Sequence, residues 1–373
     1  MKKTIFIGAN DLIVGGVQRL IIDQLRAFDQ NEFDVHLAVL MDFKDKGTFY
    51  ELVPEGVTVH RVGFSGLADI GAWMRLMKLL SKVRPQVVKT ATFFSNFVFL
   101  ILRPFFGYRV IAAEHNTLNI KPLWQRLADK ALLPTADTVI GDSTSVVEFV
   151  AKAEGINPKH FTVLYNGVDV DAVERAQIEY GPARTSIRAE YSIPPEATVI
   201  FTAGRLVHQK NHHLMIEGFA EFVKKGRDAY LMIAGGGKYE QELKELAGKL
   251  GVIDRVRLLG EQMNVHRFYA IADIFLLTSR HEGFCIAAME GLAFGQPLIS
   301  TRVAGVSEYL KDGVNGFFIE PNADDIAEKL ERAITLTDTE RASFREEGRK
   351  TARAYDIKRY QDNFMALVRK SLG

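Results

Sequence analysis

The chain has 373 residues, of which 47% are hydrophobic and 25% charged, and this composition excludes a largely disordered protein. Its net charge of +1 provides no general attraction to nucleic acid, so we expect no nucleic-acid partner. The single cysteine, Cys285, excludes an internal disulfide and indicates a reducing, cytoplasmic compartment.

The N-terminal stretch and the longest apolar run decide what is expected of membranes. The chain opens with two lysines and a short apolar stretch, which is typical of a first strand rather than a signal peptide. The longest apolar run, 97–102, is much shorter than a membrane span. We therefore expect neither a signal peptide nor a transmembrane helix.

The first half of the chain alternates short apolar strands with amphipathic helices. The expected strands are 4–7, 35–40, 57–62, 86–89, 109–112, 138–140 and 162–164. The expected helices are 17–28, 70–83, 95–106, 123–133 and 144–154. Repeated strand–helix units predict a parallel, doubly wound sheet.

Residues 165–195 interrupt the alternation with turn signals, and the pattern then restarts. The expected strands of the second half are 199–203, 230–234, 256–259, 274–277, 298–300 and 317–319. The expected helices are 212–224, 239–250, 265–271, 285–294, 323–336, 339–354 and 358–371. We predict an α/β protein of two Rossmann-like domains facing a cleft, residues 1–175 and 176–355, with a C-terminal helix at 356–373.

The stretch 279–295, SRHEGFCIAAMEGLAFG, carries the most informative pattern. An apolar strand at 273–278 precedes it, so Glu282 and Gly283 follow the carboxyl end of a strand, where ligands bind in open α/β sheets. Glu290 lies eight residues later, roughly 12 Å away in a helix. We expect the amides of Gly283, Phe284 and Cys285 to open that helix and face an anion.

Two carboxylates beside an anion site repel one another unless they face neutral groups. Glu282 and Glu290 suit sugar hydroxyls on either side of a phosphate, because a carboxylate accepts hydrogen bonds from hydroxyls. The alternative is a helix N-terminal acid favoured by the helix dipole, followed by one solvated helix acid.

A second candidate site follows the first strand of the second half, in 204–211 (GRLVHQKN). Arg205 and Lys210 flank the start of the next helix, where two cations oppose the helix dipole unless an anion lies between them. Arginine binds a phosphate through two parallel hydrogen bonds and lysine neutralises it as a point charge. This pair therefore predicts a phosphate site.

Two weaker candidates lie in the first half. Gly15 and Gly16 directly precede a helix, so their backbone could approach a phosphate; a plain turn with positive φ is the alternative. His115 follows a strand and could hydrogen-bond a sugar hydroxyl near the reacting carbon, although a lone histidine is more often structural. Asp169 and Asp171 resemble a metal-binding pair, but their turn context favours helix capping, so we expect no metal there.

Together these motifs resemble glycosyltransferase family 4. The resemblance rests on Glu282-Gly-Phe and Glu290 with seven residues between the acids, together with Gly204-Arg205 and Lys210-Asn211. Asn166-Gly167-Val168-Asp169, Gly15-Gly16 and His115 occur in the order that family shows. The resemblance covers nearly the whole chain, and the acid pair with the Arg/Lys pair is its most specific part.

The resemblance implies a GT-B fold whose last helix returns to the N-terminal domain, and transfer of a sugar with retention from a nucleotide-sugar. It also implies that no metal or other cofactor is required. It assigns the donor diphosphate to Arg205 and Lys210, the nucleotide ribose to Glu290, and the donor sugar to Glu282 and the amides after Gly283 (Phe284 and Cys285). Gly15 and Gly16 would approach the phosphates and the acceptor, and His115 the sugar. By family frequency uridine is the expected base.

The acceptor is argued separately, from residues 61–130. This segment holds eleven Lys and Arg against three Asp and Glu, a net charge of +8, with aromatic residues interleaved. Such a pattern suits an anionic bilayer, and hence a lipid-linked saccharide acceptor in bacterial cell-envelope glycan synthesis and a place at the inner face of the cytoplasmic membrane. The alternative is that the aromatics are ordinary core.

Other functions stay open at this point. A nucleotide-sugar epimerase or a glycan phosphorylase can share the fold, and a two-domain sugar-binding protein is a non-enzymatic alternative. A dehydrogenase is disfavoured, because neither half contains the dinucleotide-binding G-x-G-x-x-G turn.

Overall fold

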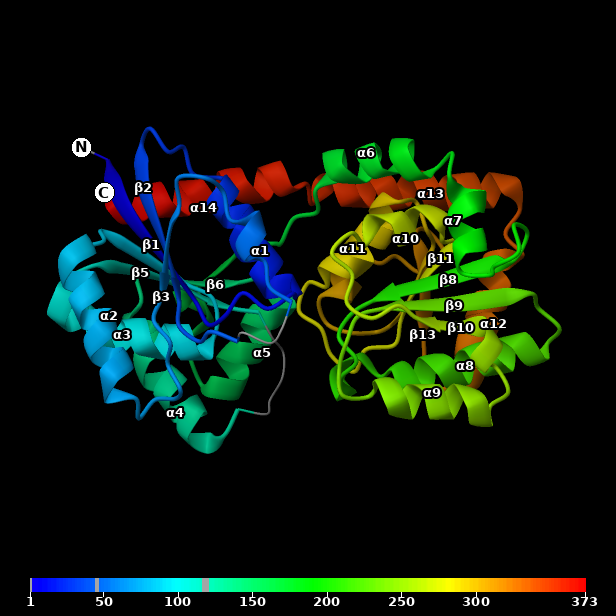
Figure 1. Cartoon of the computed structure of the whole chain (residues 1–373), viewed down its shortest axis with the longest axis horizontal. Helices are drawn as coiled ribbons and strands as arrows, with labels where there is room; N and C mark the ends of the chain where they lie inside the picture. The colour runs from blue at the N-terminus through cyan, green and yellow to red at the C-terminus, as the bar shows by residue number, and fades with distance from the viewer. Residues whose placement is uncertain (1, 44–46, 116–120) are drawn as a thin grey trace. The chain divides into compact units, whose positions relative to one another are not determined.

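A computed structural model describes residues 2–43, 47–115 and 121–373 of the chain. These residues form two compact units (Figure 1). Unit 1 consists of residues 1–166 together with 358–373, and unit 2 of residues 167–357. No helix among the described residues is long and apolar enough to cross a bilayer.

Unit 1 is built on a parallel sheet of seven strands in the order β3-β2-β1-β4-β5-β6-β7. The strands are β1 (Lys3–Ala9), β2 (Phe33–Val39), β3 (Thr58–Arg61), β4 (Val87–Thr90), β5 (Arg109–Glu114), β6 (Thr138–Gly141) and β7 (Phe161–Val163). The helices are α1 (Gly16–Arg26), α2 (Ile70–Val83), α3 (Phe93–Phe106), α4 (Leu123–Leu132), α5 (Thr144–Glu154) and α14 (Ile357–Leu372). The chain order reverses between β1 and β4, which is where ligands bind in such sheets.

Helix α2 shows how the sequence specifies this packing. Its buried residues Ala72, Leu76 and Leu80 recur every four positions and join the core on one face of the sheet. The Asp69 carboxylate caps its first turn by accepting a 2.9 Å bond from the Ala72 amide, and Arg84 in the left-handed region ends it. Helix α3 packs beside α2 and also contacts α4.

The last helix, α14, belongs to unit 1, as the resemblance implied. Phe364 and Val368 are fully buried, and the Phe364 ring packs edge-on against Phe28, with 5.8 Å between the ring centroids. The buried Gln24 amide of α1 donates to the Tyr360 hydroxyl. The C-terminal segment of the chain thus completes the core of the N-terminal unit.

Unit 2 contains a second parallel sheet, of six strands in the order β10-β9-β8-β11-β12-β13. The strands are β8 (Thr198–Ala203), β9 (Ala229–Ala234), β10 (Val256–Leu258), β11 (Ile274–Leu277), β12 (Leu298–Thr301) and β13 (Gly316–Ile319). The main helices are α8 (His212–Lys224), α9 (Glu240–Lys249), α10 (His266–Ile271), α11 (Ile286–Ala293), α12 (Ala323–Ile334) and α13 (Asp338–Ala354). Both sheets are therefore doubly wound, and the predicted fold class, α/β with two Rossmann-like sheets, is confirmed.

The segment predicted to be a turn-rich linker instead forms two helices, α6 (Val170–Tyr180) and α7 (Arg184–Glu190). Both belong to unit 2, where the Arg188 guanidinium is buried and pairs with Asp273 at 2.8 Å. The units therefore divide between Asn166 and Gly167, whereas the predicted boundary after residue 175 falls inside α6. The glycines and prolines mark the ends of these helices, not a continuous loop.

Candidate functional site

In unit 2, strand β11 leads directly into the predicted acidic turn. Glu282 is buried, and its Oε1 accepts a 2.6 Å hydrogen bond from the Ser279 hydroxyl. The same oxygen lies 2.7 Å from the Lys210 ammonium, which comes from the loop after β8. Two neighbouring strands, β8 and β11, thus bring together a cation and an acid that are 72 residues apart in the sequence.

Lys210 ends a short 3₁₀ turn, His208–Lys210, immediately before α8. Burial lowers the pKa of Lys210 and the neighbouring Glu282 carboxylate raises it; the net pKa lies above its usual value, so the side chain is charged. Its Cε lies 3.1 Å from where a Cβ on Gly204 would stand. Lys210 therefore folds back across the end of β8, and Gly204 leaves room for it.

We expected an anion between Arg205 and Lys210. The Glu282 carboxylate partly takes the place of that anion, because it neutralises Lys210. Arg205 is exposed, and its charge acts on Lys210 by lowering the pKa of that lysine. The three groups together carry one net positive charge.

The helix after the acidic turn begins one residue later than predicted. Cys285 is its N-cap, at a φ of 61°, and α11 starts at Ile286. A non-glycine residue with positive φ is strained, and such strain concentrates at functional turns. Burial raises the pKa of the Cys285 thiol to about 12, so it stays protonated. Phe284 is buried between Tyr309 and Tyr355, with ring centroids 5.4 and 5.2 Å away.

The end of β12 and the loop that follows it hold the acidic turn in place from the other side. The Thr301 hydroxyl donates a 2.6 Å bond to the Ser279 carbonyl, and the Tyr309 hydroxyl donates a 3.0 Å bond to the Phe284 carbonyl. Gly305 lies so close that a Cβ on it would stand 1.5 Å from the Gly283 carbonyl oxygen. The backbone that carries Glu282 and Gly283 is therefore fixed by contacts on two sides.

Glu290 has different partners from Glu282. It lies in α11, partly exposed, with its Oε1 3.3 Å from the His266 Nε2 of α10. It also acts on the buried Tyr269, whose pKa is raised first by burial and then by the Glu290 charge. The two predicted carboxylates thus occupy separate environments, Glu282 with a lysine and Glu290 with a histidine.

In unit 1, Gly15 and Gly16 lie at the N-terminus of α1. Neither has positive φ, so the alternative that they serve a turn of that kind is excluded. A Cβ on Gly16 would meet nothing within 4 Å, so this backbone faces open space. That geometry is compatible with a ligand approaching the first amides of α1.

His115 follows β5, and only 6% of its side chain is exposed. Its Nδ1 is 3.6 Å from the Asp142 carboxylate, beyond hydrogen-bond distance, and neither ring nitrogen has a hydrogen-bond partner among the described residues. Asp142 itself accepts a 3.4 Å bond from Asn166. Buried polar atoms are rarely left unpaired, so this group of side chains suits a polar ligand.

Sequence reasoning missed four of these residues: Ser279, Thr301, His266 and Asp142. Asp142 follows β6 as His115 follows β5, so the rule that found the histidine could have found it. The other three are recognised only by their contacts, because serine, threonine and histidine occur throughout the chain.

The capping interpretation of Asp169 is confirmed. Its carboxylate accepts a 2.8 Å bond from the Ala172 amide at the start of α6. Among the described residues, no group of three or more His, Cys, Asp or Glu is arranged to hold a metal ion.

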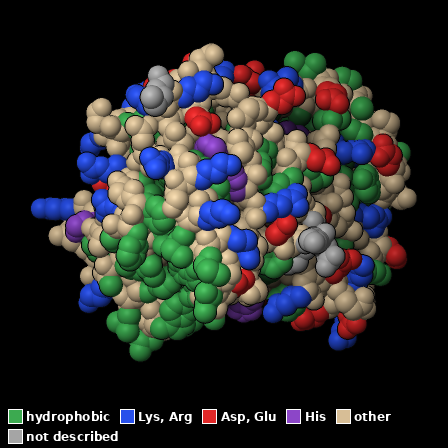
Figure 2. All heavy atoms as spheres, turned by 60° about the vertical axis from the view of Figure 1, so that its left-hand side comes forward, with side chains coloured by type: hydrophobic (Ala, Val, Ile, Leu, Met, Phe, Trp, Pro, Cys, Tyr) green, Lys and Arg blue, Asp and Glu red, His purple; other side chains and the backbone are tan. Residues whose placement is uncertain are grey.

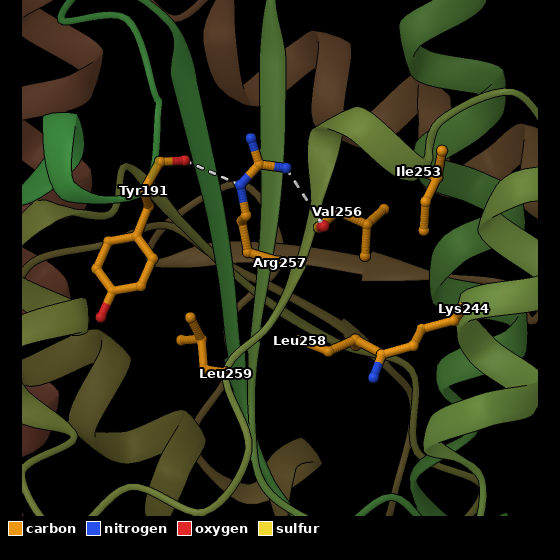
Figure 3. Close-up of a pocket in the computed structure, with 7 residues that line it drawn as sticks. All are labelled: Tyr191, Lys244, Ile253, Val256, Arg257, Leu258 and Leu259. Carbon is orange, nitrogen blue, oxygen red and sulfur yellow. Dashed lines mark hydrogen bonds between the residues drawn. The ribbon is translucent and has the colours of Figure 1, made fainter.

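A cavity of about 440 Å³ lies elsewhere in unit 2, beside the edge strand β10 (Figure 3). It is lined by Tyr191, Lys244, Ile253, Val256, Arg257, Leu258 and Leu259. The Arg257 guanidinium is fixed by the Tyr191 carbonyl at 2.9 Å and the Asp254 carbonyl at 2.7 Å. None of the predicted site residues lines this cavity. Its arginine stabilises the fold by holding the two carbonyl groups to which it donates.

Two family models match the chain. The model described as Glycosyltransferase Family 4 matches residues 14–172, and the one described as Glycosyl transferases group 1 matches residues 183–351. The chain belongs to glycosyltransferase family 4. Its two matched regions lie one in each unit, apart from residues 167–172.

Two curated relatives of this family 4 chain are named as glycosyltransferases. The lipopolysaccharide core biosynthesis glycosyltransferase LpsE of Rhizobium meliloti is 34% identical over 148 residues, 39% of this chain and 42% of that protein. An N-acetylgalactosaminyltransferase of Campylobacter jejuni, named for a diphospho-undecaprenol substrate, is 26% identical over 92% of this chain and 93% of its own. The matches to the first three curated relatives span only about half of those proteins.

Solved structures share the fold over the whole chain. The Anabaena HepE structure in complex with UDP and glucose has a TM-score of 0.85 at 17% identity, covering 99% of this chain and 100% of its own. WaaG, a glycosyltransferase involved in lipopolysaccharide biosynthesis, has a TM-score of 0.75 at 18% identity, covering 96% and 98%. At these identities the likeness concerns the fold.

Proposed function

We propose that this family 4 protein transfers a hexosyl or N-acetylhexosaminyl group from a UDP-sugar to a lipid-linked saccharide, with retention and without a metal ion. The observation that carries the proposal is the group Arg205, Lys210 and Glu282 at the carboxyl ends of β8 and β11. The name of the Campylobacter relative supports a lipid-linked acceptor, and the UDP in HepE supports the donor class.

The charges of this group suit a departing diphosphate. Arg205 and Lys210 stabilise the negative charge that develops on the phosphate oxygens, which is the role a divalent cation fills in other transferases. Glu282 keeps Lys210 charged before the donor binds, and Ser279 fixes the carboxylate for a hydroxyl of the donor sugar. Glu290, beside His266, takes the ribose hydroxyls.

The proposed reaction is a same-face displacement. The bond between the anomeric carbon and the phosphate oxygen breaks, the acceptor oxygen bonds to that carbon from the same side, and the acceptor proton passes to the leaving phosphate oxygen. No covalent nucleophile is needed, and UDP departs with the proton. His115 donates or accepts a hydrogen bond at a sugar hydroxyl through its ring nitrogens, which have no partner among the described residues.

The decisive experiment combines binding with turnover. A thermal-shift panel of UDP, GDP, ADP and their sugar conjugates should raise the unfolding midpoint most for UDP and one UDP-sugar, because only ligands of the folded state stabilise it. That UDP-sugar should release UDP only when a polyprenyl-diphosphate-linked saccharide is added, with or without EDTA. Anomeric configuration of the product is read by NMR.

The other readings predict different results. Nucleotide release without any acceptor indicates an epimerase, and a requirement for inorganic phosphate indicates a phosphorylase. Midpoint shifts without turnover of any conjugate indicate a sugar-binding protein. Activity abolished by EDTA and restored by Mg²⁺ or Mn²⁺ overturns the metal-independent mechanism.

A further inference from the structure

Three helices of unit 1, α2, α3 and α4, expose an unusual number of large apolar side chains. On α2, Ile70 is 72% exposed and Met74 58%, and both lie on the side away from the core. On α4, Leu123 is 69% exposed and Leu127 58%, one turn apart. Figure 2 shows hydrophobic side chains gathered into one patch on this side of the chain, with Lys and Arg at its margin.

Trp124 is the most firmly held member of this apolar face. Its ring packs edge-on against Phe93 and Phe97 of α3, with centroids 5.5 and 6.4 Å away, yet 49% of the residue remains exposed. An exposed indole fixed in one orientation loses little conformational freedom when it contacts a partner. Contiguous exposed apolar surface of this kind marks an interaction site.

The exposed charges on the three helices themselves are of one sign, and the partly exposed Asp69 carboxylate, which caps α2 before Ile70, is the acid beside them. Helices α2 and α3 contain no acidic residue, and the one acid of α4, Asp129, is buried against Lys121. Lys78, Lys82 and Lys130 are exposed and form no ion pair with the described residues. The apolar face is thus bordered by cations and by no exposed carboxylate of its own helices.

The structure also corrects which basic residues are available. Among those expected to contact a bilayer, Arg103 and Arg109 pair with Asp137 at 3.0 and 2.8 Å. Lys121 lies within 3.1 Å of three buried carboxylates, Glu114, Asp129 and Glu154. Arg126 donates to the Ala153 carbonyl. Lys78 and Lys82 of α2 and Lys130 at the end of α4 remain exposed and unpaired among the residues that the structure describes.

We propose that Ile70, Met74, Leu123, Trp124 and Leu127 insert into the surface of an anionic bilayer, with Lys78, Lys82 and Lys130 contacting lipid phosphates. A second copy of this chain is a poorer partner, because a twofold contact would place these cations near their own copies without acids to pair. A bilayer supplies both the apolar layer and the anions.

The position of the face agrees with the proposed function, on which the choice of bilayer partly rests. The first turns of α2 and α4 follow β3 and β5, so Ile70, Leu123 and Trp124 lie at the carboxyl ends of the strands. His115 and Gly16 lie at that same edge of the unit 1 sheet. A lipid-linked acceptor would therefore arrive at the end of unit 1 that carries these residues.

The test is flotation of the whole protein with phosphatidylcholine vesicles that contain or lack phosphatidylglycerol, at low and high salt. Wild type should float with the anionic vesicles and be partly released by salt. The apolar variant I70Q/M74Q/L123Q/L127Q should lower the partition coefficient by at least about tenfold. The charge variant K78E/K82E/K130E should lose binding mainly at low salt.

Two control variants make the same kinds of change on unit 2. I178Q replaces one apolar residue of α6 that is 77% exposed, and K225E/K249E/K311E makes the same change in charge as the charge variant. Both controls should float like wild type. In a Trp73→Phe background Trp124 is the sole indole, and its fluorescence should shift to shorter wavelength on anionic vesicles.

Absence of wild-type flotation at low salt overturns the inference, as does equal loss in the unit 2 controls. A dimer in gel filtration that the apolar variant converts to a monomer, without vesicle binding, assigns the face to a second copy. Calorimetry with UDP separates this inference from the proposed function: the apolar variant should keep the wild-type affinity. Flotation without transfer to a lipid-linked saccharide would contradict the proposed acceptor, while the proposed membrane contact of this face would still hold.

Discussion

At the scale of single residues, the pair formed by Lys210 and Glu282 changes what substitutions should do. Arg205 is exposed, so Arg205→Ala should cause little loss of stability. It should lower kcat/KM by an amount equivalent to roughly 3 kcal/mol of lost transition-state stabilisation. Lys210→Met should cost similar activity and also about 3 kcal/mol of unfolding free energy, because the buried Glu282 loses its partner. Urea unfolding and steady-state kinetics of both variants measure this difference.

The double variant K210M/E282Q provides the control for that prediction. It removes both charges, so much of the stability should return while activity stays low. If Arg205→Ala and Lys210→Met were equally stable, the ion pair between Lys210 and Glu282 would contribute nothing to the stability of the fold. The sequence alone did not reveal that the lysine and the glutamate meet.

Lys89 on β4 is the second residue with an unusual environment. It is fully buried, its Nζ has no hydrogen-bond partner among the described residues, and burial lowers its pKa to about 7. Lys89→Met should therefore raise the free energy of unfolding at pH 7, by on the order of 2 kcal/mol. Lys249→Met, at an exposed position, is the matched control and should be neutral.

The pH dependence of this gain has a defined sign. The folded pKa of Lys89 lies below the unfolded value, so the unfolded state binds more protons between about pH 7 and 10. Wild-type stability rises with pH across that window, and the advantage of methionine should shrink there. A gain that stays constant with pH would show that packing, rather than charge, is its source.

At the scale of elements, the loop after β12 limits how the acidic turn can move. Gly305→Ala would place a methyl group against the Gly283 carbonyl, so we expect the loop to shift, the midpoint to fall and UDP affinity to drop about tenfold or more. Gly248→Ala in α9 is the control, because its Cβ meets nothing within 4 Å. Calorimetry measures the UDP affinity of both variants. Unchanged affinity in G305A would show that this loop does not contribute to donor binding.

The sequence predicted most strands and helices because apolar runs and helical periodicity report burial directly. It failed at 165–195, where glycine and proline signals hid α6 and α7, whose place depends on contacts such as Arg188 with Asp273. It named Glu282, Lys210 and His115 from their positions after strands. The same rule would have found Asp142, which follows β6, but it could not find Ser279, because the bond from Ser279 to Glu282 is recognised only in three dimensions.

At the scale of the whole molecule, histidines whose pKa is lowered by burial reduce the free energy of unfolding as the pH falls. Burial and then the nearby Lys210 charge lower the pKa of His212 to about 3, and burial with the adjacent His36 lowers that of His60. Between about pH 6.5 and 3 the unfolded state therefore binds protons that the folded state does not, and stability falls as pH falls. For His212 the loss between pH 7 and 5 is about 2 kcal/mol.

His212→Gln should remove part of this acid sensitivity in unit 2, whereas His160→Gln, at an exposed position in unit 1, should not. Urea unfolding at pH 7 and pH 5 measures both slopes. The two units need not unfold together, so the transitions are followed by more than one probe. An unaltered slope in H212Q would assign the acid response to other groups.

The return of α14 to unit 1 has a consequence for synthesis. Residues 1–166 leave the ribosome before unit 2, but Phe364 and Val368, which fill their core, are made only after unit 2. All of unit 2 is translated in between, which takes roughly 10 to 40 s at ordinary elongation rates. Unit 1 is therefore synthesised with Phe28 still exposed to solvent, because Phe364 has not yet been made. Unit 2 can finish folding before unit 1 does.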